Sequence, residues 1–374
     1  MSEKIWANSG DSHFIEPAGL WHEMMPKALA DRMPRSERIG DTEEIVHVDG
    51  KQFRRQLPKL ASKKDKDGLT IGDLVMRPPG ARDLSLRMKD LDDEGIWAEI
   101  VFSSLGLWEN LIEDRELVRA AARVENEYKA QAIEGMAPGR LVAAATLPML
   151  DAADAAAEVE HAASLGLRCI SLPTGVPDGV PNYNREYWEP VWAAAEANGM
   201  VVAFHIGSDN NGKDNIAYTG PGGAVLNYCE TTFGGQKCAM MMVASGALDR
   251  HPDLKVLIAE GGATWVPQLA DRMDEGYRQH ATFVRPLLTR LPSEILFSQV
   301  YASFQHDRSA SAALTAMGYQ NVVWGSDYPH TEGTFGHTQK TLHELFDDID
   351  PAASHRIRIG AFKELFPHVT DPPA

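Results

Sequence analysis

Three side chains near the two ends of the sequence could bind a metal ion. Asp11 and His13 are two residues apart, and Asp327 lies near the C-terminus, three residues before His330. Residues two apart on an extended segment project to the same side, so Asp11 and His13 can act on one ion. Carboxylate and imidazole groups together suit Zn²⁺ or Mn²⁺ and can leave a position open for water or substrate.

Two further polar residues stand where short apolar runs end. His205 ends the run Val201–His205, and Glu260 follows Val256–Ala259. If folding brings these segments together, we expect one divalent metal ion, Zn²⁺ or Mn²⁺, to be bound by four side chains: Asp11, His13, His205 and Asp327. The candidate catalytic residues are Asp327, Glu260 and His330. Glu260 is suited to hydrogen-bond water or a substrate hydroxyl, and His330 is suited to line the pocket.

Eight short apolar runs are the elements that must position these residues. Several have the composition of strands that are buried on both faces. They are Ile5–Ser9, Ala98–Ser103, Leu141–Thr146, Cys169–Leu172, Val201–His205, Val256–Ala259, Gln299–Phe304 and Val322–Gly325. Helix-length segments separate most of them, which favours a parallel sheet. Eight such units favour an α/β fold of the (β/α)8 TIM-barrel type over a doubly wound sheet, and barrel active sites form at the carboxyl ends of the strands.

The helical segments show apolar spacings of three and four or carry end signals. The longer ones are Ala81–Glu94, Asp114–Glu134, Asp151–Leu165, Tyr187–Asn198, Ala224–Leu248, Trp265–Gln279 and Arg308–Met317, and Leu342–Phe346 and Ala352–Phe366 close the chain. Residues 20–80 form a segment too long for an ordinary connection after the first predicted strand, Ile5–Ser9. We expect them to form an inserted cap within one domain that spans 1–374. A hairpin of Ile45–Val48 and Gln52–Leu57 around Asp49-Gly50 is predicted there, before the charged run 63–68.

Composition restricts the partners of this protein. The chain has 374 residues and a formal net charge of −17, which argues against nucleic acid or an anionic membrane as the main partner. No run of 18 apolar residues occurs, and the N-terminus lacks the apolar core of a signal peptide. Three cysteines are too few for a disulfide framework. We therefore predict a cytoplasmic protein that acts on a small molecule.

Four motifs together resemble the amidohydrolase superfamily. They are Asp11-Ser12-His13-Phe14-Ile15-Glu16-Pro17, Phe204-His205-Ile206-Gly207, Leu257-Ile258-Ala259-Glu260-Gly261-Gly262 and Trp324-Gly325-Ser326-Asp327-Tyr328-Pro329-His330. Within that superfamily they resemble the amidohydrolase-related branch of aminocarboxymuconate-semialdehyde decarboxylase and the aromatic-acid decarboxylases. The resemblance covers nearly the whole chain, and residues 20–80 are its least covered part.

The resemblance implies a role for each matching position. His13, His205 and Asp327 match metal ligands, and Asp327 also matches a general acid and base. Asp11 stands where the hydrolases have histidine, and no lysine follows Cys169–Leu172 to bridge a second ion. A single metal ion is therefore implied. Branch members are commonly homodimers, and we expect aromatic residues such as Trp188 and Trp192 to serve such an interface.

Two reactions remain compatible with these residues. The resemblance favours non-oxidative decarboxylation of an aromatic or unsaturated carboxylic acid, with Asp327 delivering the proton. The alternative is hydrolysis of an amide, a lactone or an activated C–C bond by a metal-activated water. Glu260 favours hydrolysis or a related lyase reaction, because decarboxylases of this branch often place a histidine there. The substrate on either reading is a small carboxylic acid or carbonyl compound.

Overall fold

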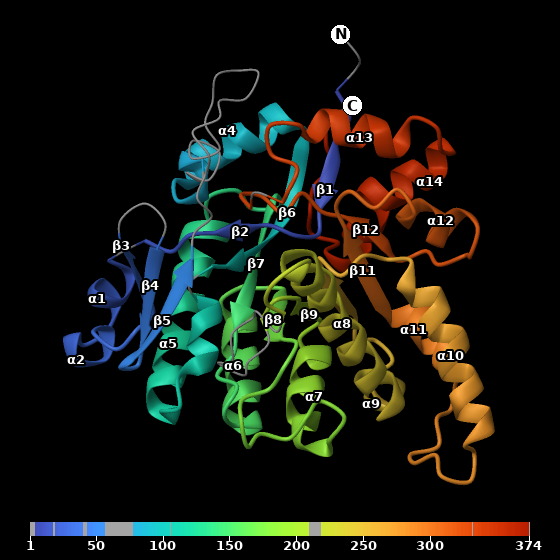
Figure 1. Cartoon of the computed structure of the whole chain (residues 1–374), viewed down its shortest axis with the longest axis horizontal. Helices are drawn as coiled ribbons and strands as arrows, with labels where there is room; N and C mark the ends of the chain where they lie inside the picture. The colour runs from blue at the N-terminus through green and yellow to red at the C-terminus, as the bar shows by residue number, and fades with distance from the viewer. Residues whose placement is uncertain are drawn as a thin grey trace.

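A parallel β-barrel forms the centre of the computed structural model, which describes residues 4–17, 19–39, 43–56, 78–104, 106–208, 218–330 and 332–373. Eight strands of the described chain follow one another in sequence order around it (Figure 1): β1 (Ala7–Ser9), β6 (Ile96–Ser103), β7 (Leu141–Thr146), β8 (Cys169–Pro173), β9 (Val201–His205), β10 (Val256–Ala259), β11 (Val300–Phe304) and β12 (Val322–Trp324). Every adjacent pair along this order is parallel. The (β/α)8 prediction is confirmed.

The barrel is nearly closed by contacts between its first and last strands. Gly10 N donates to Trp324 O at 2.8 Å, and Asp327 N donates to Asp11 O at 3.0 Å. The short strand β2 (His13–Phe14) pairs with β6, beyond the end of β1. The segment that carries Asp11 and His13 is thus held between β6 on one side and the segment after β12 on the other.

Alternation of side chains along the strands divides the core into two parts. In β7, Val142 and Ala144 belong to the cluster inside the barrel, and Leu141 and Ala143 belong to the cluster under the helices. Phe362 and Phe366 also join the inner cluster, from α15 (Ala361–Leu365) and the residue after it. The predicted strands therefore read as apolar throughout because they are buried on both faces.

The helices cover the outside of the barrel (Figure 1). They are α4 (Leu84–Glu94), α5 (Arg115–Tyr128), α6 (Ala152–Ser164), α7 (Glu189–Ala197), α8 (Gly223–Ala244), α9 (Ala247–Arg250), α10 (Trp265–Gln279), α11 (Pro292–Gln299), α12 (Ala310–Thr315), α13 (Thr338–Phe346) and α14 (Pro351–His355). Asp83, Asp114 and Asp151 cap α4, α5 and α6 by accepting backbone N–H bonds. The described part of the chain also contains two π-helical turns, η3 (Lys129–Glu134) and η5 (Arg356–Gly360).

Two helix predictions needed correction. The segment Ala224–Leu248 is not one helix, because Gly246 adopts a left-handed φ of 73° and separates α8 from α9. Helix α11 was not predicted, and it ends at Gln299, a residue that the sequence analysis placed at the start of the strand Gln299–Phe304. Both errors concern boundaries that tertiary packing sets, and neither changes the order of the strands.

The segment after β2 forms a small unit beside α5. It comprises α1 (Leu20–Met24), α2 (Lys27–Ala30) and an antiparallel sheet of β3 (Arg35–Ile39), β4 (Glu43–Val48) and β5 (Lys51–Gln56). Asp49 and Gly50 have φ values of 47° and 74°, as a tight hairpin turn requires. The predicted hairpin is therefore present, with β3 as an additional strand. Leu57 and the charged run 63–68 lie outside the described residues.

The prediction that Trp188 and Trp192 serve a subunit interface is wrong. Their exposed fractions are 0% and 1%, and both rings pack against Tyr183. A tryptophan near a helix start gives no sign in the sequence of which face it occupies. Among the described residues, no helix has both the length and the apolar composition needed to cross a membrane.

Candidate metal centre

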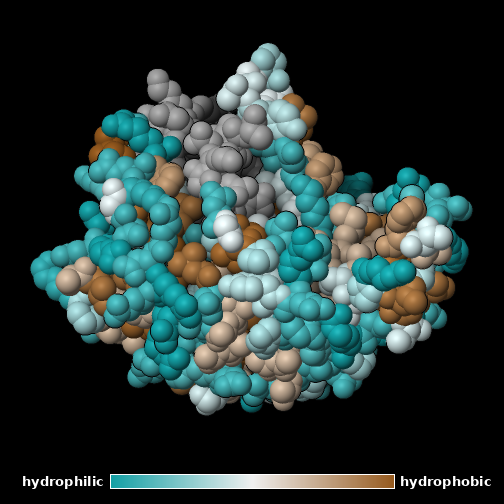
Figure 2. Space-filling view, turned by 90° about the horizontal axis from the view of Figure 1, so that it is seen from below, coloured by the Kyte–Doolittle hydropathy of each residue, from teal (hydrophilic) through white to brown (hydrophobic). Residues whose placement is uncertain are grey.

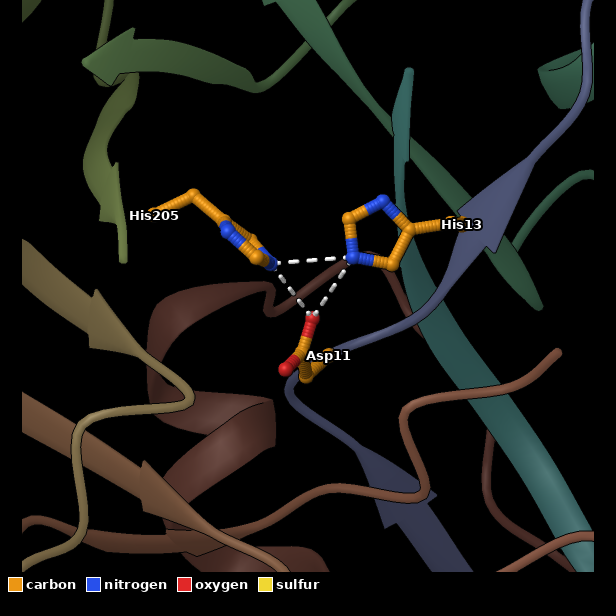
Figure 3. A group of neighbouring side chains, drawn as sticks. All are labelled: Asp11, His13 and His205. Carbon is orange, nitrogen blue, oxygen red and sulfur yellow. Dashed lines mark hydrogen bonds and ion pairs between the residues drawn. The ribbon is translucent and has the colours of Figure 1, made fainter. Parts of the chain in front are cut away.

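The side chains proposed from the sequence come together at one end of the barrel. Asp11 lies between β1 and β2, His13 begins β2, and His205 ends β9. Figure 3 shows the Asp11 carboxylate and the two imidazoles pointing toward a common point. Glu260 follows β10 and Asp327 follows β12, so all five residues lie at the end of the barrel where the carboxyl ends of β1, β6, β9, β10 and β12 meet. This is the end at which barrel enzymes place their active sites.

Both histidines are oriented through Nδ1 toward backbone carbonyl groups. His13 Nδ1 lies 3.2 Å from Ser103 O, and His205 Nδ1 lies 2.7 Å from Ile206 O. These contacts favour the tautomer in which Nδ1 carries the hydrogen and Nε2 presents a lone pair. The two Nε2 atoms are 3.0 Å apart. Two nitrogen lone pairs thus converge on the space that a cation would occupy.

Two buried carboxylates face the same space. Asp11 Oδ1 is 3.2 Å from His205 Nε2 and 3.7 Å from His13 Nε2, and Asp327 Oδ1 is also 3.7 Å from His13 Nε2. Both aspartates are fully buried. Asp11 Oδ2 has no hydrogen-bond partner among the described residues. A carboxylate oxygen buried in this way is favourable only beside a cation.

Glu260 and His330 complete the ring of polar groups. Glu260 Oε2 is 3.8 Å from His205 Nε2, and its side chain is 11% exposed. His330 Nδ1 is 2.8 Å from Asp327 Oδ1, and the His330 ring stacks on the His13 ring at 4.1 Å. His330 therefore orients Asp327 and covers one face of His13.

The protein groups alone leave an excess of negative charge at this centre. Burial lowers the pKa of His205, but the charge and hydrogen bond of Asp11, together with Glu260, raise it to about 9. Burial and the charges of Asp327 and Asp11 raise the pKa of Glu260 to about 8. Both shifts show a site that favours added positive charge. Among the described residues, three overlapping sets have ligand atoms within 4.8 Å of one another and could hold an ion: Asp11/His13/His205, His13/Asp327/His330 and Asp11/Glu260/Asp327. The donor set fits a divalent metal with nitrogen and oxygen ligands.

The backbone is strained at two of these positions. Glu260 and Asp327 have positive φ values of 61° and 52°, which non-glycine residues rarely adopt. Neighbouring groups hold both residues in place: Glu260 N donates to Ser303 Oγ at 2.8 Å, and Asp327 N donates to Asp11 O. Each left-handed residue costs about 1–3 kcal/mol, and such residues cluster at functional sites.

A buried arginine supports the Asp11–His13 segment, and the sequence did not reveal it. Arg87 of α4 donates to His13 O at 2.7 Å and to Ser12 Oγ at 2.9 Å. It also pairs with Glu99 of β6 through Nε, and its guanidinium lies 4.8 Å from the centre of the Tyr328 ring. Arg87 therefore connects β2, β6 and the segment after β12. It stands in a charged helix, where nothing in the pattern separates an inward from an outward arginine.

Comparison with known proteins places these observations in a family. The profile of the family described as Amidohydrolase matches residues 76–361. A curated relative, decarboxylase yanB of Aspergillus niger, is 24% identical over 278 residues, which is 69% of each chain. An amidohydrolase from Mycobacterium avium subsp. paratuberculosis has a similar fold, with a TM-score of 0.78, 19% identity and coverage of 97% of this chain and 100% of the other.

A third similar protein carries a metal ion. The structure of 5-carboxyvanillate decarboxylase from Novosphingobium aromaticivorans, with bound manganese and 3-methoxy-4-hydroxy-5-nitrobenzoic acid, aligns with a TM-score of 0.68 and 15% identity. The alignment covers 97% of both chains. At such identities the similarity establishes a shared fold, and the chemistry of this chain has to be argued from its own residues.

Proposed function

The chain belongs to the amidohydrolase family, and from that premise we propose that it is a metal-dependent, non-oxidative decarboxylase. The proposed substrate is an aromatic or unsaturated carboxylic acid. The observation that carries the proposal is the convergence of two imidazole Nε2 atoms, 3.0 Å apart, on buried aspartate oxygens. The relative in Aspergillus niger and the manganese-bound neighbour, both named as decarboxylases, support the choice of reaction.

The proposed ligands are Asp11, His13, His205 and Asp327, and one Mn²⁺ or Zn²⁺ ion suits them. A bound ion would supply a Lewis acid that stabilises negative charge on the substrate. The chain's own groups orient these ligands. Ser103 O and Ile206 O hold the two imidazoles by Nδ1, and Arg87 holds the backbone of His13.

Proton delivery is assigned to Asp327. Its Oδ1 lies 2.8 Å from His330 Nδ1, so the pair can hold a proton beside the substrate. Transfer of this proton to the carbon that bears the carboxylate prepares the C–C bond for cleavage. The electron pair of that bond returns to the ring as CO₂ leaves, so no oxidant is needed. His330 can return a proton to Asp327 from solvent because its side chain is 22% exposed.

Hydrolysis is the second candidate, and Glu260 is the observation that favours it. Its carboxyl group stands 3.8 Å from His205 Nε2, within the ring of polar groups. A carboxylate there is suited to orient an attacking water or to accept its proton. The same barrel end would then act on an amide, a lactone or an activated C–C bond beside a carbonyl group.

A substrate panel separates the two reactions. The Mn²⁺-loaded or Zn²⁺-loaded protein is incubated with hydroxybenzoic acids and, separately, with aryl amides and lactones in ¹⁸O-labelled water. Decarboxylation predicts CO₂ release and no ¹⁸O in the aromatic product. Label in a newly formed carboxylic acid would instead support hydrolysis and overturn the decarboxylase proposal.

Metal content tests the ligand assignment without any substrate. After chelation and reloading, the wild-type protein should contain about one ion per chain, and His205→Ala should lose at least tenfold in metal affinity. His343→Ala is the matched control, because His343 lies on α13 and contacts Asp347 at 3.0 Å. Equal metal content in all three proteins would contradict the assignment.

The protein is also proposed to be a homodimer that acts in the cytoplasm. Helix α8 exposes four apolar side chains that a second copy could cover: Val225, Leu226, Tyr228 and Phe233, which are 49–68% exposed. Brown patches among teal ones in Figure 2 show that the face of the molecule seen in that view is mixed in hydropathy. Light scattering of the wild type and of Leu226→Glu tests this assembly, and a monomeric wild type would refute it.

A further inference from the structure

A small cavity lies at the carboxyl ends of β6, β7 and β8, beside the candidate metal centre. Its lining includes Ser103, Thr146 and Ser171, and its volume is about 20 Å³. Ser103 also provides the carbonyl oxygen that lies 3.2 Å from His13 Nδ1. A space of roughly 10–15 Å³ on this measure holds about one water molecule. The cavity therefore fits a substituent of about one non-hydrogen atom on a molecule bound at the centre.

Two hydroxyl groups in the wall of the cavity have fixed directions. Ser103 Oγ donates to Glu125 Oε1, and Thr146 Oγ1 donates to Glu125 Oε2 at 2.7 Å. A hydroxyl has one hydrogen to donate and two lone pairs that accept. With their hydrogens directed at Glu125, both side chains offer only acceptor lone pairs to the cavity.

The charges behind the wall keep these directions. Glu125 and Lys129 are fully buried, and Lys129 Nζ lies 3.2 Å from Glu125 Oε1. Lys129 Nζ also donates to Thr146 Oγ1 and to Ala144 O, each at 2.8 Å. Burial and the charge of Glu125 raise the pKa of the neighbouring Glu109 well above its usual range. Glu125 is paired with Lys129 by this contact, and a carboxylate in such a pair accepts hydrogen bonds and donates none.

We propose that Ser103 and Thr146 form a specificity subsite for one hydrogen-bond donor, a hydroxyl or an amino group, on the ring of the substrate. This substituent is distinct from the oxygen adjacent to the reacting carboxylate. The inference rests on the proposed decarboxylase function and names its substrate class: an aromatic acid with a further hydroxyl or amino group. A methoxy group is too large and has no hydrogen to donate. A second carboxylate has three non-hydrogen atoms and is likewise too large for a cavity of about 20 Å³.

Direct binding to the Mn²⁺-loaded wild type tests the subsite independently of turnover. The ligands are 2-hydroxybenzoic acid and derivatives that carry a hydroxyl, amino, methoxy or carboxylate group at each free ring position. At one position we expect the hydroxyl or amino derivative to bind about tenfold more tightly than the parent acid. At that position the methoxy and carboxylate derivatives should bind at least about tenfold more weakly than the parent.

Each outcome of the panel decides a stated point. If the parent acid binds and hydroxyl and methoxy derivatives are equal at every position, the subsite is refuted and the proposed function stands. If none of the acids binds, both proposals fail. Thr146→Val and Thr146→Ser provide a matched pair, read as the ratio of affinities for the donor-bearing and parent acids. The ratio should fall about tenfold in the valine variant and persist in the serine variant, and an unchanged ratio in Thr146→Val would also refute the subsite.

Discussion

Replacement of Arg87 by methionine should destabilise the fold by about 3–5 kcal/mol, the usual cost of removing one partner of a buried ion pair. Arg87 and Glu99 are both fully buried, and Glu99 Oε1 accepts directly from Arg87 Nε. Glu99 Oε2 already has no hydrogen-bond partner among the described residues. Without Arg87, both oxygens of a buried carboxylate would be left without a cation, and His13 O and Ser12 Oγ would each lose a donor.

The double variant separates the ion pair from the other contacts of Arg87. Replacing both Arg87 and Glu99 by methionine removes the two charges together and fills a similar volume with apolar atoms. A buried pair replaced in this way is often nearly neutral, so the remaining cost is the loss of the bonds to His13 O and Ser12 Oγ, about 1 kcal/mol each. We therefore expect the double variant to be more stable than Arg87→Met alone, with a coupling of several kcal/mol.

Urea unfolding of the metal-free variants measures this cycle, and competition with a chelator measures the metal affinity. Arg87→Met should also bind metal about 10–100-fold more weakly, because the backbone of His13 is no longer held. Lys89→Met is the control: Lys89 lies on the same helix, is 70% exposed and pairs with Asp93. Its effect should stay below about 0.5 kcal/mol. The reasoning would be refuted if Arg87→Met lowered the free energy of unfolding by less than about 1 kcal/mol. It would also be refuted if the effects of replacing Arg87 and Glu99 singly added up to the effect of the double variant.

Three further perturbations test buried charge and backbone strain. Burial raises the pKa of Glu134 from 4.5 to about 7 in the folded protein. As the pH rises from 4.5 to 7, the unfolded chain therefore loses this proton before the folded protein does, and the free energy of unfolding falls. Glu134→Gln should remove about 2 kcal/mol of that fall, as urea unfolding at pH 5 and pH 8 will show, and an unchanged pH dependence would contradict it. Glu125→Gln should lower the free energy of unfolding by about 3–5 kcal/mol, because it leaves Lys129 without its carboxylate. Glu109→Gln replaces a protonated acid and should lower it by less than about 1 kcal/mol in the same assay. Equal losses would contradict the assignment of the charge to Glu125. Gly50→Ala, at a φ of 74°, should lower stability by about 1 kcal/mol in thermal unfolding, and an unchanged melting temperature would show that the turn relaxes.

The barrel could be predicted from the sequence because its strands have a strong local signal. A strand buried on both faces must be apolar along its whole length, as Val201–Phe204 is, and few other elements of that length are. Capping aspartates such as Asp114 and Asp151 likewise mark helix starts through bonds to residues two and three positions later. The positions of Asp11, His205 and Asp327 then followed from one rule, that the ends of barrel strands meet at a single mouth.

The supporting contacts could not be predicted, since they join residues distant in sequence whose types are common on surfaces. Glu125 and Lys129 are four apart on a helix, which in sequence is the pattern of an exposed ion pair. In the structure both are fully buried, and they hold Ser103 and Thr146 from two different strands. Burial of such a pair depends on which face of α5 turns inward, and the surrounding residues are too mixed to indicate it.

The buried carboxylates explain how an acidic protein could act on the acid that we propose as its substrate. The chain has a net charge of −17, yet Asp11 and Asp327 are fully buried and are directed at the same point as two imidazole nitrogens. Surface charges are screened beyond about 8–10 Å at ordinary ionic strength, whereas an ion within the ligand set acts on the substrate at contact distance. Binding of a cation relieves the mutual repulsion of the aspartates, so the fold itself favours the loaded state. The sign of the field that the substrate meets is therefore decided by the bound cation and not by the total charge of the chain.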